Sequence, residues 1–259
     1  MCTLVVAAHV VPGSPLLVVA NRDEQRGRAS SPPLRWPGGF VAPRDEVAGG
    51  TWLGLNDAGV FVAITNRYLG PRDATRTSRG ALVVEALRGR SARDVHDAMG
   101  RVDPARYNGF HLVYADATDV LATISDGTDL AQLTLGSGLS IVTERSFGAA
   151  ARDAEGARRV ERIRAAFGRL VTEPFEPERV TTLLAEHDDA DPLAATCIHL
   201  DALGYGTRSA MVLTLPDGPG AAAMARGARM FWAEGPPCTT PFAEIDLPTV
   251  ARADAAKTG

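Results

Sequence analysis

The hydrophobic pattern of this chain consists mainly of short apolar runs separated by turn signals. The β-rich runs at residues 4–9 and 16–20 flank a Pro-Gly-Ser turn, which predicts a β-hairpin at the start of the chain. A second hairpin is predicted where the runs 51–55 and 60–65 flank the sequence Asn-Asp-Ala-Gly. The segment 25–39 between the hairpins is rich in Arg, Ser, Pro and Gly, so it is expected to be a loop.

Helical signals lie between the strand candidates. The clearest helix start is Ser91, an N-cap residue type that precedes a run of helix formers ended by Gly100. The longest helical candidate repeats apolar residues every three to four positions, with Arg and Glu between them. Helices are predicted at 78–87, 91–99, 149–170 and 178–186, and further strands at 110–115, 120–125, 130–135, 207–215 and 230–233.

This order of elements predicts an α+β fold in which helices pack on sheets. Because turns of hairpin length join most neighbouring strand candidates, the sheets are expected to be antiparallel. No internal repeat, low-complexity tract or linker divides the sequence, so residues 1–245 are interpreted as a single domain. The remaining residues, 246–259, are expected to form a flexible tail.

Composition narrows the classes of function without selecting one. Hydrophobic residues occupy 45% of the 259 positions and charged residues 22%, which is ordinary for a soluble globular protein. The formal net charge of −4 argues against a nucleic-acid binder, which usually carries a basic face. No run approaches the ~20 apolar residues of a membrane span, and no basic segment precedes an apolar one as in a secretory signal. We therefore expect no membrane insertion and a cytoplasmic location.

The three cysteines are Cys2, Cys197 and Cys238. Their odd number and wide spacing argue against a disulfide framework and a Cys-x-x-Cys metal site, and they favour a reducing compartment. His199 stands two positions after Cys197, but a Cys-x-His pair without a second pair is weak support for zinc, so a structural role is favoured. No cofactor or metal is predicted.

Cys2 is the most informative position for chemistry. Cells usually remove an initiator Met that precedes a small residue, and Cys2 would then carry both a thiol and the α-amine of the mature chain. An α-amine has an ordinary pKa of roughly 7.7–8.0, so it can act as a base near neutral pH, and a thiolate is a strong nucleophile. One residue could thus supply both nucleophile and base. The alternative is that Cys2 is a small buried hydrophobic residue.

Several polar residues are candidates to surround this thiol. Arg22 and Asp23 follow a strand that is predicted to pair with the first one, so both are expected near the start of the chain. An arginine there would stabilise a thiolate, and a carboxylate would orient the amine. Asn66 ends another apolar strand and could donate to an oxyanion, while Arg208 could contact an anion. For each residue taken alone, a turn or structural role is the alternative.

A glycine-dense turn, Gly-Gly-Thr-Trp-Leu-Gly, spans residues 49–54. It lacks the glycine and lysine spacing of a phosphate-binding loop. Backbone bends around a packed Trp52 are therefore favoured over a ligand role, although Trp52 could also line a pocket.

Six short motifs follow one another between residues 1 and 235. They are Met-Cys-Thr at the start, Ala-Asn-Arg-Asp-Glu at 20–24, Gly-Thr-Trp-Leu-Gly at 50–54, Thr-Asn-Arg at 65–67, Ser-Arg-Gly at 78–80 and Tyr-Gly-Thr-Arg-Ser at 205–209. Together they resemble the NRDE-motif family, also called the transport and Golgi organization protein 2 family. The resemblance implies the fold of N-terminal nucleophile hydrolases, a four-layer αββα sandwich in which two antiparallel sheets face each other between helices.

The resemblance also implies roles for individual residues, by similarity to cysteine hydrolases that act on penicillin V and conjugated bile acids. Cys2 is similar to the nucleophile of these enzymes, and its own amine to the base. Arg22 is similar to the arginine beside the thiol, and Asp23 to the aspartate that engages the amine. Asn66 is similar to an oxyanion-hole asparagine, and Arg208 to an arginine late in the chain that lies near the nucleophile.

One position departs from the pattern of those hydrolases. They carry a second asparagine after a strand in the middle of the chain, where this sequence has Glu144. A carboxylate would repel an oxyanion, so Glu144 is expected either to occupy a different position or to alter the oxyanion site. Together with Asn21 and Trp52, Glu144 is expected to line the substrate pocket.

The resemblance implies two functions that the sequence leaves open. The first is hydrolysis of a linear amide or an acyl (thio)ester of a small molecule, through an acyl-enzyme on Cys2 after removal of Met1. The alternative is a non-catalytic protein that kept the fold and binds or traffics haem, lipid or acyl-CoA, because eukaryotic relatives are linked to such ligands. Both functions require a small-molecule partner, and neither involves nucleic acid.

Overall fold

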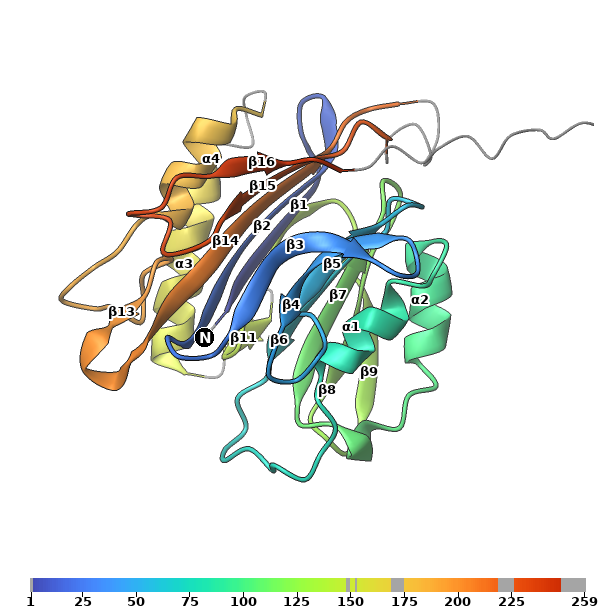
Figure 1. Ribbon diagram of the computed structural model, residues 1–259, viewed down its shortest axis with the longest axis horizontal. Coiled ribbons are helices and arrows are strands. Elements are labelled where there is room, and N and C mark those ends of the chain that lie inside the picture. Colours follow the sequence, from blue (N-terminus) through green and yellow to red (C-terminus); the bar gives the residue numbers. More distant parts are fainter. Residues whose placement is uncertain (1, 148–149, 152, 169–174, 219–225, 248–259) are drawn as a thin grey trace, which may run out of the picture.

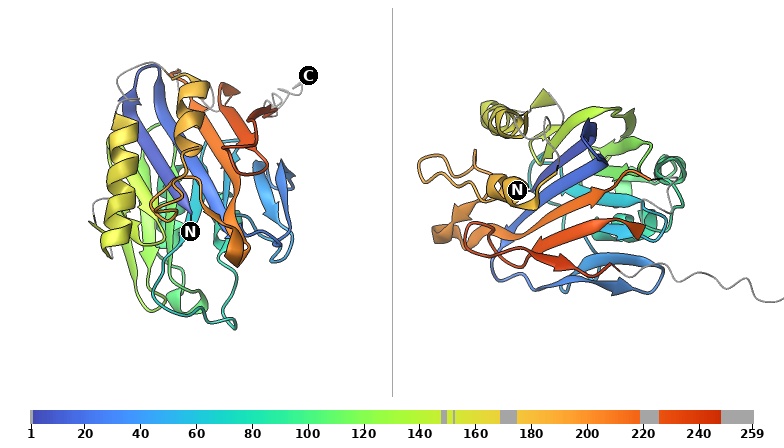
Figure 2. Two further views of the ribbon diagram at one scale, coloured as in Figure 1. Left: turned by 90° about the vertical axis from the view of Figure 1, so that its left-hand side faces the viewer. Right: turned by 90° about the horizontal axis from the view of Figure 1, so that it is seen from above.

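The computed structural model describes residues 2–147, 150–151, 153–168, 175–218 and 226–247. Within these residues, two antiparallel sheets face each other, and helices cover the outer face of each sheet (Figures 1 and 2). The predicted αββα sandwich is thus confirmed. Met1 and residues 248–259 of the predicted tail lie outside the described residues.

The first sheet has nine strands within the described residues, and its centre is the hairpin at the start of the chain. Strand β13 (His199–Leu200) pairs with β14 and lies beside the main path of the sheet. In spatial order the other strands are β12 (Ala150–Ala151), β11 (Ser146–Phe147), β10 (Gly138–Thr143), β1 (Thr3–Val11), β2 (Ser14–Gln25), β14 (Tyr205–Leu215), β15 (Arg229–Ala233) and β16 (Ala243–Ile245).

The second sheet has seven strands, each paired with its neighbour in the sequence. They are β3 (Ser30–Trp36), β4 (Phe40–Asp45), β5 (Leu53–Asn56), β6 (Phe61–Asn66), β7 (Phe110–Ala115), β8 (Val120–Ser125) and β9 (Leu130–Thr134). This arrangement confirms the predicted hairpin around residues 56–59 and the three strands that follow residue 109.

Four α-helices form the two outer layers among the described residues. Helices α1 (Gly80–Ala86) and α2 (Ala92–Met99) pack on the second sheet, and α3 (Ala154–Gly168) and α4 (Pro177–Leu184) pack on the first. Ser91 caps α2 as predicted, because its hydroxyl accepts a hydrogen bond from the Asp94 amide at 3.1 Å. Short 3₁₀ turns occupy Pro104–Arg106 and Asp201–Leu203.

The first apolar run of the chain is continuous because β1 is buried on both faces. Leu4 and Val6 belong to the core between the two sheets, whereas Val5 and Ala7 belong to the core beneath α3 and α4. A strand that is covered on both sides has no polar face and therefore shows no alternation. This central position places Cys2 directly before the first residue of a central strand of the sheet.

The prediction of a loop at residues 25–39 is wrong over part of its length. Residues 30–36 form strand β3, although Pro32 and Pro33 lie within it. Proline lacks an amide donor, but β3 is the edge strand of its sheet and pairs only with β4. The register also shifts between Ser31 and Leu34, so the prolines fall at an irregularity of the ladder. Edge position and bulge together make the two prolines compatible with a strand.

Gly50 and Gly80 form a close contact between the turn before β5 and the start of α1. A Cβ atom added to Gly50 would lie 2.7 Å from the carbonyl carbon of Gly80, and this neighbour is backbone that cannot rotate away. We expect Gly50→Ala to lower the free energy of unfolding by about 1–3 kcal/mol, measured by urea unfolding. Gly27→Ala is the control, because its Cβ would meet open space. An equal effect of both substitutions would contradict the packing role of Gly50.

Candidate active site

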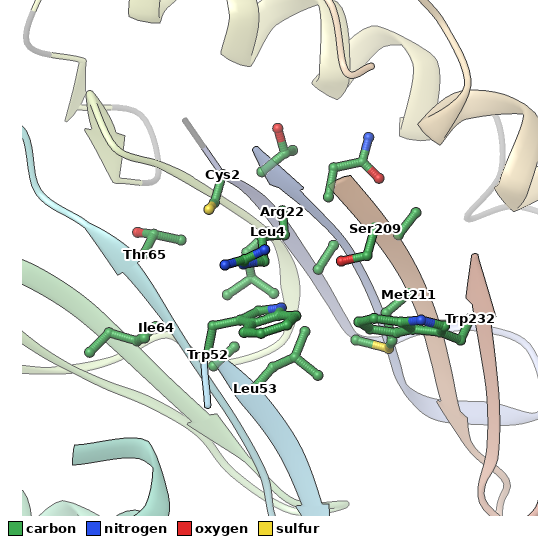
Figure 3. A pocket seen from close by; sticks show the side chains of 15 residues that line it. Cys2, Leu4, Arg22, Trp52, Leu53, Ile64, Thr65, Ser209, Met211 and Trp232 are labelled. Carbon is green, nitrogen blue, oxygen red and sulfur yellow. The ribbon is translucent and has the colours of Figure 1, made fainter. Parts of the chain in front are cut away.

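The start of the chain lies beside the polar end of β2. Thr3 pairs with Asn21 in the antiparallel ladder, so Cys2, which precedes β1, lies next to Arg22, which continues β2 and pairs with Ser209 of β14. Figure 3 shows the Cys2 sulfur and the Arg22 guanidinium facing one space between the sheets, with Trp52 beneath them. Strand pairing between β1 and β2 therefore produces the juxtaposition that the sequence predicts.

Two pockets meet at Cys2. The polar cleft, of about 200 Å³, contains Cys2, Arg22, Asp23, Trp52 and Asn66. The apolar pocket is narrow and shares Cys2, Arg22 and Trp52 with the cleft. It extends between the sheets, where its lining includes Leu4, Leu53, Ala63, Met211 and Trp232. Five of the eight predicted site residues thus border one cleft.

The Cys2 thiol is held close to the backbone of β2. Its Sγ atom lies 4.0 Å from the carbonyl oxygen of Asp23, to which the thiol donates. Burial raises the pKa of the Cys2 thiol, and the Asp23 carboxylate acts in the same direction, whereas the positive chain terminus and Arg22 lower it. The resting thiol is therefore protonated, and a nucleophilic attack requires a nearby base to accept its proton.

Arg22 is a buried cation with an unused donor. Its side chain is 6% exposed, and its guanidinium carbon lies 4.2 Å from the ring centroid of Trp52. Glu24 lies 3.9 Å away, and the Nη1 atom is buried without a hydrogen-bond partner within the described part of the chain. Burial lowers the pKa of Arg22, while the Cys2 and Glu24 charges raise it. A buried donor without a partner is costly, so Nη1 is suited to an acceptor group of a ligand.

Asp23 is fixed from several directions behind the thiol. One carboxylate oxygen accepts a hydrogen bond from Thr207 at 2.6 Å, and the other lies 3.3 Å from Arg159. The Tyr205 hydroxyl donates to the backbone carbonyl of Asp23 at 3.0 Å. Burial raises the pKa of Asp23, and the positive chain terminus and Arg159 oppose this rise. The positive start of the chain is therefore one of the charges that act on this buried carboxylate.

Arg159 is a site residue that the sequence analysis missed. It lies on α3, its side chain is 2% exposed, and it donates to the Thr3 hydroxyl as well as to Asp23. It thus joins the first residue of β1 to the end of β2. A signal existed in the sequence, because Arg159 stands four and eight positions before Ile163 and Phe167, on the apolar face of its helix.

The polar cleft carries more positive charge than was predicted. Arg79 lines it, and burial together with the charge of Arg72 lowers the pKa of Arg79 to about 10, while Cys2 and Glu24 oppose this shift. Arg79 belongs to the Ser-Arg-Gly motif, which the sequence analysis quoted without assigning it a role. The charged residues of the cleft are Arg22, Arg28, Arg72 and Arg79 against Asp23, Glu24 and Asp45.

Asn66 ends strand β6 at the rim of the polar cleft. Its side chain is exposed, and its amide makes no hydrogen bond within the described residues. An amide in this position is free to donate to a group bound in the cleft.

Asn21 lines the apolar pocket, but its amide is directed away from it. The Nδ2 atom donates to the carbonyl oxygens of Leu184 at 3.0 Å and Thr196 at 2.8 Å. Asn21 thereby ties β2 to the segment that follows α4. A role in substrate binding stays a prediction for this residue.

Arg208 and Glu144 border neither the polar cleft nor the apolar pocket. Arg208 is half-buried at a bulge in β14, and its Nε atom has no hydrogen-bond partner among the described residues. Glu144 follows β10 and lines a separate groove of about 590 Å³, where its carboxylate lies 3.7 Å from Arg145. The structure therefore does not bring these two residues into the set around Cys2.

His111 lies in the wall of this separate groove and is buried as a neutral ring. Its Nδ1 atom lies 3.2 Å from the Thr65 hydroxyl, and its ring packs against Phe147. Burial lowers the pKa of His111 to about 4, and the Arg67 charge acts in the same direction. In the unfolded chain, His111 takes up a proton once the pH falls below its ordinary pKa. In the folded state it resists protonation down to about pH 4, so the free energy of unfolding decreases as the pH falls between these two values.

We expect this histidine to reduce the free energy of unfolding by about 3 kcal/mol between pH about 6.5 and pH about 4. A His111→Gln variant cannot take up this proton, so its stability should decline less steeply over the same interval. Urea unfolding of both proteins at several pH values measures the difference. Parallel pH profiles would show that His111 does not titrate as its burial indicates.

No helix in the described part of the chain is long and apolar enough to cross a membrane. No curated protein matches the chain in sequence.

Solved structures share the fold at low sequence identity. The Caenorhabditis elegans ortholog of N-acylethanolamine-hydrolyzing acid amidase is 12% identical, with a TM-score of 0.59 over 89% of this chain and 98% of that one. A cysteine-to-alanine mutant of the conjugated bile acid hydrolase from Clostridium perfringens is 11% identical, with a TM-score of 0.58 over 95% of this chain and 92% of that one. An arginine-to-leucine variant of the same hydrolase has a TM-score of 0.54 at 10% identity, over 99% and 100% of the two chains.

These structures are N-terminal nucleophile hydrolases, and each match covers most of both chains. The sequence gives more specific evidence of relationship than the structural comparison does. It matches the family described as transport and Golgi organisation 2 over residues 1–220, which is most of the chain, and the protein belongs to that family.

Proposed function

We propose that the mature protein, with Met1 removed, is an N-terminal cysteine hydrolase that cleaves a linear amide or an acyl thioester of a small molecule. The observation that carries this proposal is the convergence of Cys2, Arg22 and Asp23 at one cleft, with the carboxylate buried behind the thiol. The names of the structural relatives support it, since they denote hydrolases. The bile acid hydrolase mutant also replaces a cysteine at position two, which is the position of Cys2 in this chain.

The first step uses the two functional groups of the mature Cys2. Its α-amine accepts the thiol proton, and Asp23 stabilises the resulting ammonium ion. The thiolate attacks the substrate carbonyl carbon, and the carbonyl oxygen becomes an oxyanion. The Asn66 amide supplies a donor for this oxyanion, and the free Nη1 of Arg22 supplies a positive charge close to the sulfur.

The second step releases the leaving group and then the acyl group. The tetrahedral intermediate collapses, the C–N or C–S bond breaks, and the leaving amine or thiol takes the proton from the ammonium ion. The acyl group is then bound to the Cys2 sulfur. A water molecule gives one proton to the amine and attacks the thioester carbon. The C–S bond then breaks, the carboxylic acid leaves, and the Cys2 sulfur takes the proton back from the ammonium ion.

The two pockets differ in polarity, which suggests that the substrate has an apolar acyl part and a polar part. The apolar pocket is lined mostly by hydrocarbon, including Leu4 and Met211, but its cavity is only about 10 Å³, so these side chains would have to move apart for an acyl chain to enter. The polar cleft contains four arginines against three carboxylates, and this positive excess suits an anionic group on the portion of the substrate that leaves. We therefore assign the acyl chain to the apolar pocket and the polar portion of the substrate to the cleft.

The same division favours a second candidate, in which the protein binds an acyl compound or another apolar anion such as haem without cleaving it. The raised pKa of the buried Cys2 thiol supports this candidate, because a protonated thiol is not nucleophilic. Binding without cleavage predicts that Cys2→Ala retains full ligand affinity and full biological effect.

Intact-mass analysis after incubation with acylated amines and acyl thioesters tests the proposal. The mature protein should gain one acyl group, and Cys2→Ala should gain none. Iodoacetamide provides the control, because it reports whether Cys2 is accessible. If iodoacetamide alkylates Cys2 but no acyl donor ever labels it or is hydrolysed, the hydrolase proposal fails and the binding function is favoured.

A further inference from the structure

Two cysteines and two histidines gather beside β13, outside the polar cleft. His199 begins β13, Cys197 lies two positions before it, His187 lies in the segment after α4, and Cys238 lies in the segment after β15. The pair that was visible in the sequence, Cys-x-His, lacked a second pair. The tertiary structure supplies a second pair. It consists of His187, 12 positions before His199, and Cys238, 41 positions after Cys197.

The distances between the donor atoms match a tetrahedral metal site. The Cys197 and Cys238 sulfurs are 3.6 Å apart, and the His199 Nε2 atom lies 3.4 Å from the first and 3.1 Å from the second. Tetrahedral Zn²⁺ with ordinary bond lengths separates two sulfurs by about 3.8 Å and a sulfur from a nitrogen by about 3.6 Å. Three donors therefore already lie within a few tenths of an ångström of the required separations.

His187 completes the group. Donor atoms of His187, His199 and Cys238 all lie within 4.8 Å of one another, and the two imidazole rings are 5.5 Å apart. His187 is exposed, so its ring can turn toward the other donors without repacking the core. Cys197, in contrast, is fully buried, which gives the group a fixed inner side and an outer side open to an incoming ion.

The surrounding backbone holds the donors in place. The Cys197 amide donates to the Glu186 carbonyl at 2.8 Å, so the residue before His187 is fastened beside Cys197. The Thr239 and Thr240 amides both donate to the Pro236 carbonyl and form a turn around Cys238. The arrangement is thus part of the ordered structure and not a chance approach of long side chains.

We propose that His187, Cys197, His199 and Cys238 bind one Zn²⁺ ion. Two thiolates and two imidazoles are a common donor set for zinc, and four protein ligands leave no position for water or substrate. The site is therefore structural. It fastens the segment after α4 and the segment after β15 to the end of the first sheet.

This site is linked to the residues around Cys2 by two short chains of hydrogen bonds. The Ile198 amide donates to the Thr207 hydroxyl at 2.8 Å, and this hydroxyl donates to Asp23 at 2.6 Å. The Asn21 amide donates to the Thr196 carbonyl, one residue before Cys197. Bound zinc would thus stabilise the wall that holds Asp23, whether or not the cleft is catalytic.

Metal analysis of the full-length protein, purified with reductant and without chelator, tests the proposal. We expect one Zn²⁺ per chain, and we expect Co²⁺ substitution to give the intense absorption bands of tetrahedral thiolate coordination. Cys238→Ser and His187→Ala should each lose stoichiometric zinc and these bands. Cys2→Ser is the matched control, since it removes the third cysteine and should leave the zinc content unchanged.

Stability supplies a second measurement that does not depend on activity. A chelator should lower the melting temperature of the parent protein but not that of His187→Ala, whose exposed side chain leaves the core intact. Zinc content near zero after reconstitution, with no cobalt bands, would overturn the proposal. A Cys197–Cys238 disulfide in protein purified without reductant, with no metal bound under any condition, would also overturn it and assign the pair to redox chemistry.

Discussion

Cys2→Ser is expected to lower turnover of any cleavable acyl substrate by at least about a thousandfold, while leaving the free energy of unfolding close to that of the parent. A serine hydroxyl is far less acidic than a thiol, so the α-amine cannot generate a comparable nucleophile. The side chain of Cys2 is half-buried at a cleft, and the exchange of sulfur for oxygen leaves its volume nearly unchanged. Steady-state kinetics and urea unfolding on the same preparations measure both effects.

A second variant separates the roles of thiol and amine. Insertion of one alanine between Met1 and Cys2 keeps the thiol but moves the α-amine to another residue. If the amine is the base, this variant should lose as much turnover as Cys2→Ser while iodoacetamide still alkylates Cys2. Retention of most of the turnover would show that another group accepts the proton.

Arg159→Met is expected to lower the free energy of unfolding by about 3–5 kcal/mol. The side chains of Arg159 and Asp23 are 2% and 0% exposed, so loss of the guanidinium removes a cationic partner from a buried carboxylate. The Thr3 hydroxyl loses its donor as well, and the link through Arg159 between the first residue of β1 and Asp23 is lost. Turnover should therefore fall together with stability.

The neighbouring Arg158 is the matched control for this substitution. Its side chain is 57% exposed and forms a surface pair with Asp191 at 3.5 Å, so Arg158→Met should change stability by no more than about 0.5 kcal/mol. An Asp23→Asn, Arg159→Met double variant removes both charges and should be less destabilised than the sum of the single variants. Full additivity would mean that the two side chains do not act as a pair.

Most of the strands, and the proximity of Arg22 to Cys2, could be predicted from the sequence for a physical reason. Strands β1, β2, β7 and β8 are apolar runs bounded by turn residues, and this pattern reflects local burial and local turn geometry. Antiparallel pairing of β1 with β2 follows from the short turn between them, and it brings Arg22 next to Cys2. The αββα architecture was different, because it came from the resemblance of the motifs and not from periodicity.

The residues that were missed depend on contacts between distant segments. Arg159 reaches Asp23 across 136 positions, and Thr207 reaches it across 184. Strand β3 was read as a loop because its prolines are compatible with pairing only at a sheet edge, and the position of an edge is a property of the assembled sheet. Glu144 likewise belongs to another groove for reasons that no local pattern contains.

The sequence by itself determined most strands and turns, the cysteine at position two and the family, because each of these depends on residues that are neighbours in the chain. Only the tertiary structure decided which charges surround Cys2, where Arg208 and Glu144 lie, and that Cys238 and His187 meet the pair Cys197 and His199. Side chains that are far apart in the chain converge through the packing of whole sheets and helices. Long-range packing, unlike burial or turn geometry, leaves no periodic trace in a single sequence.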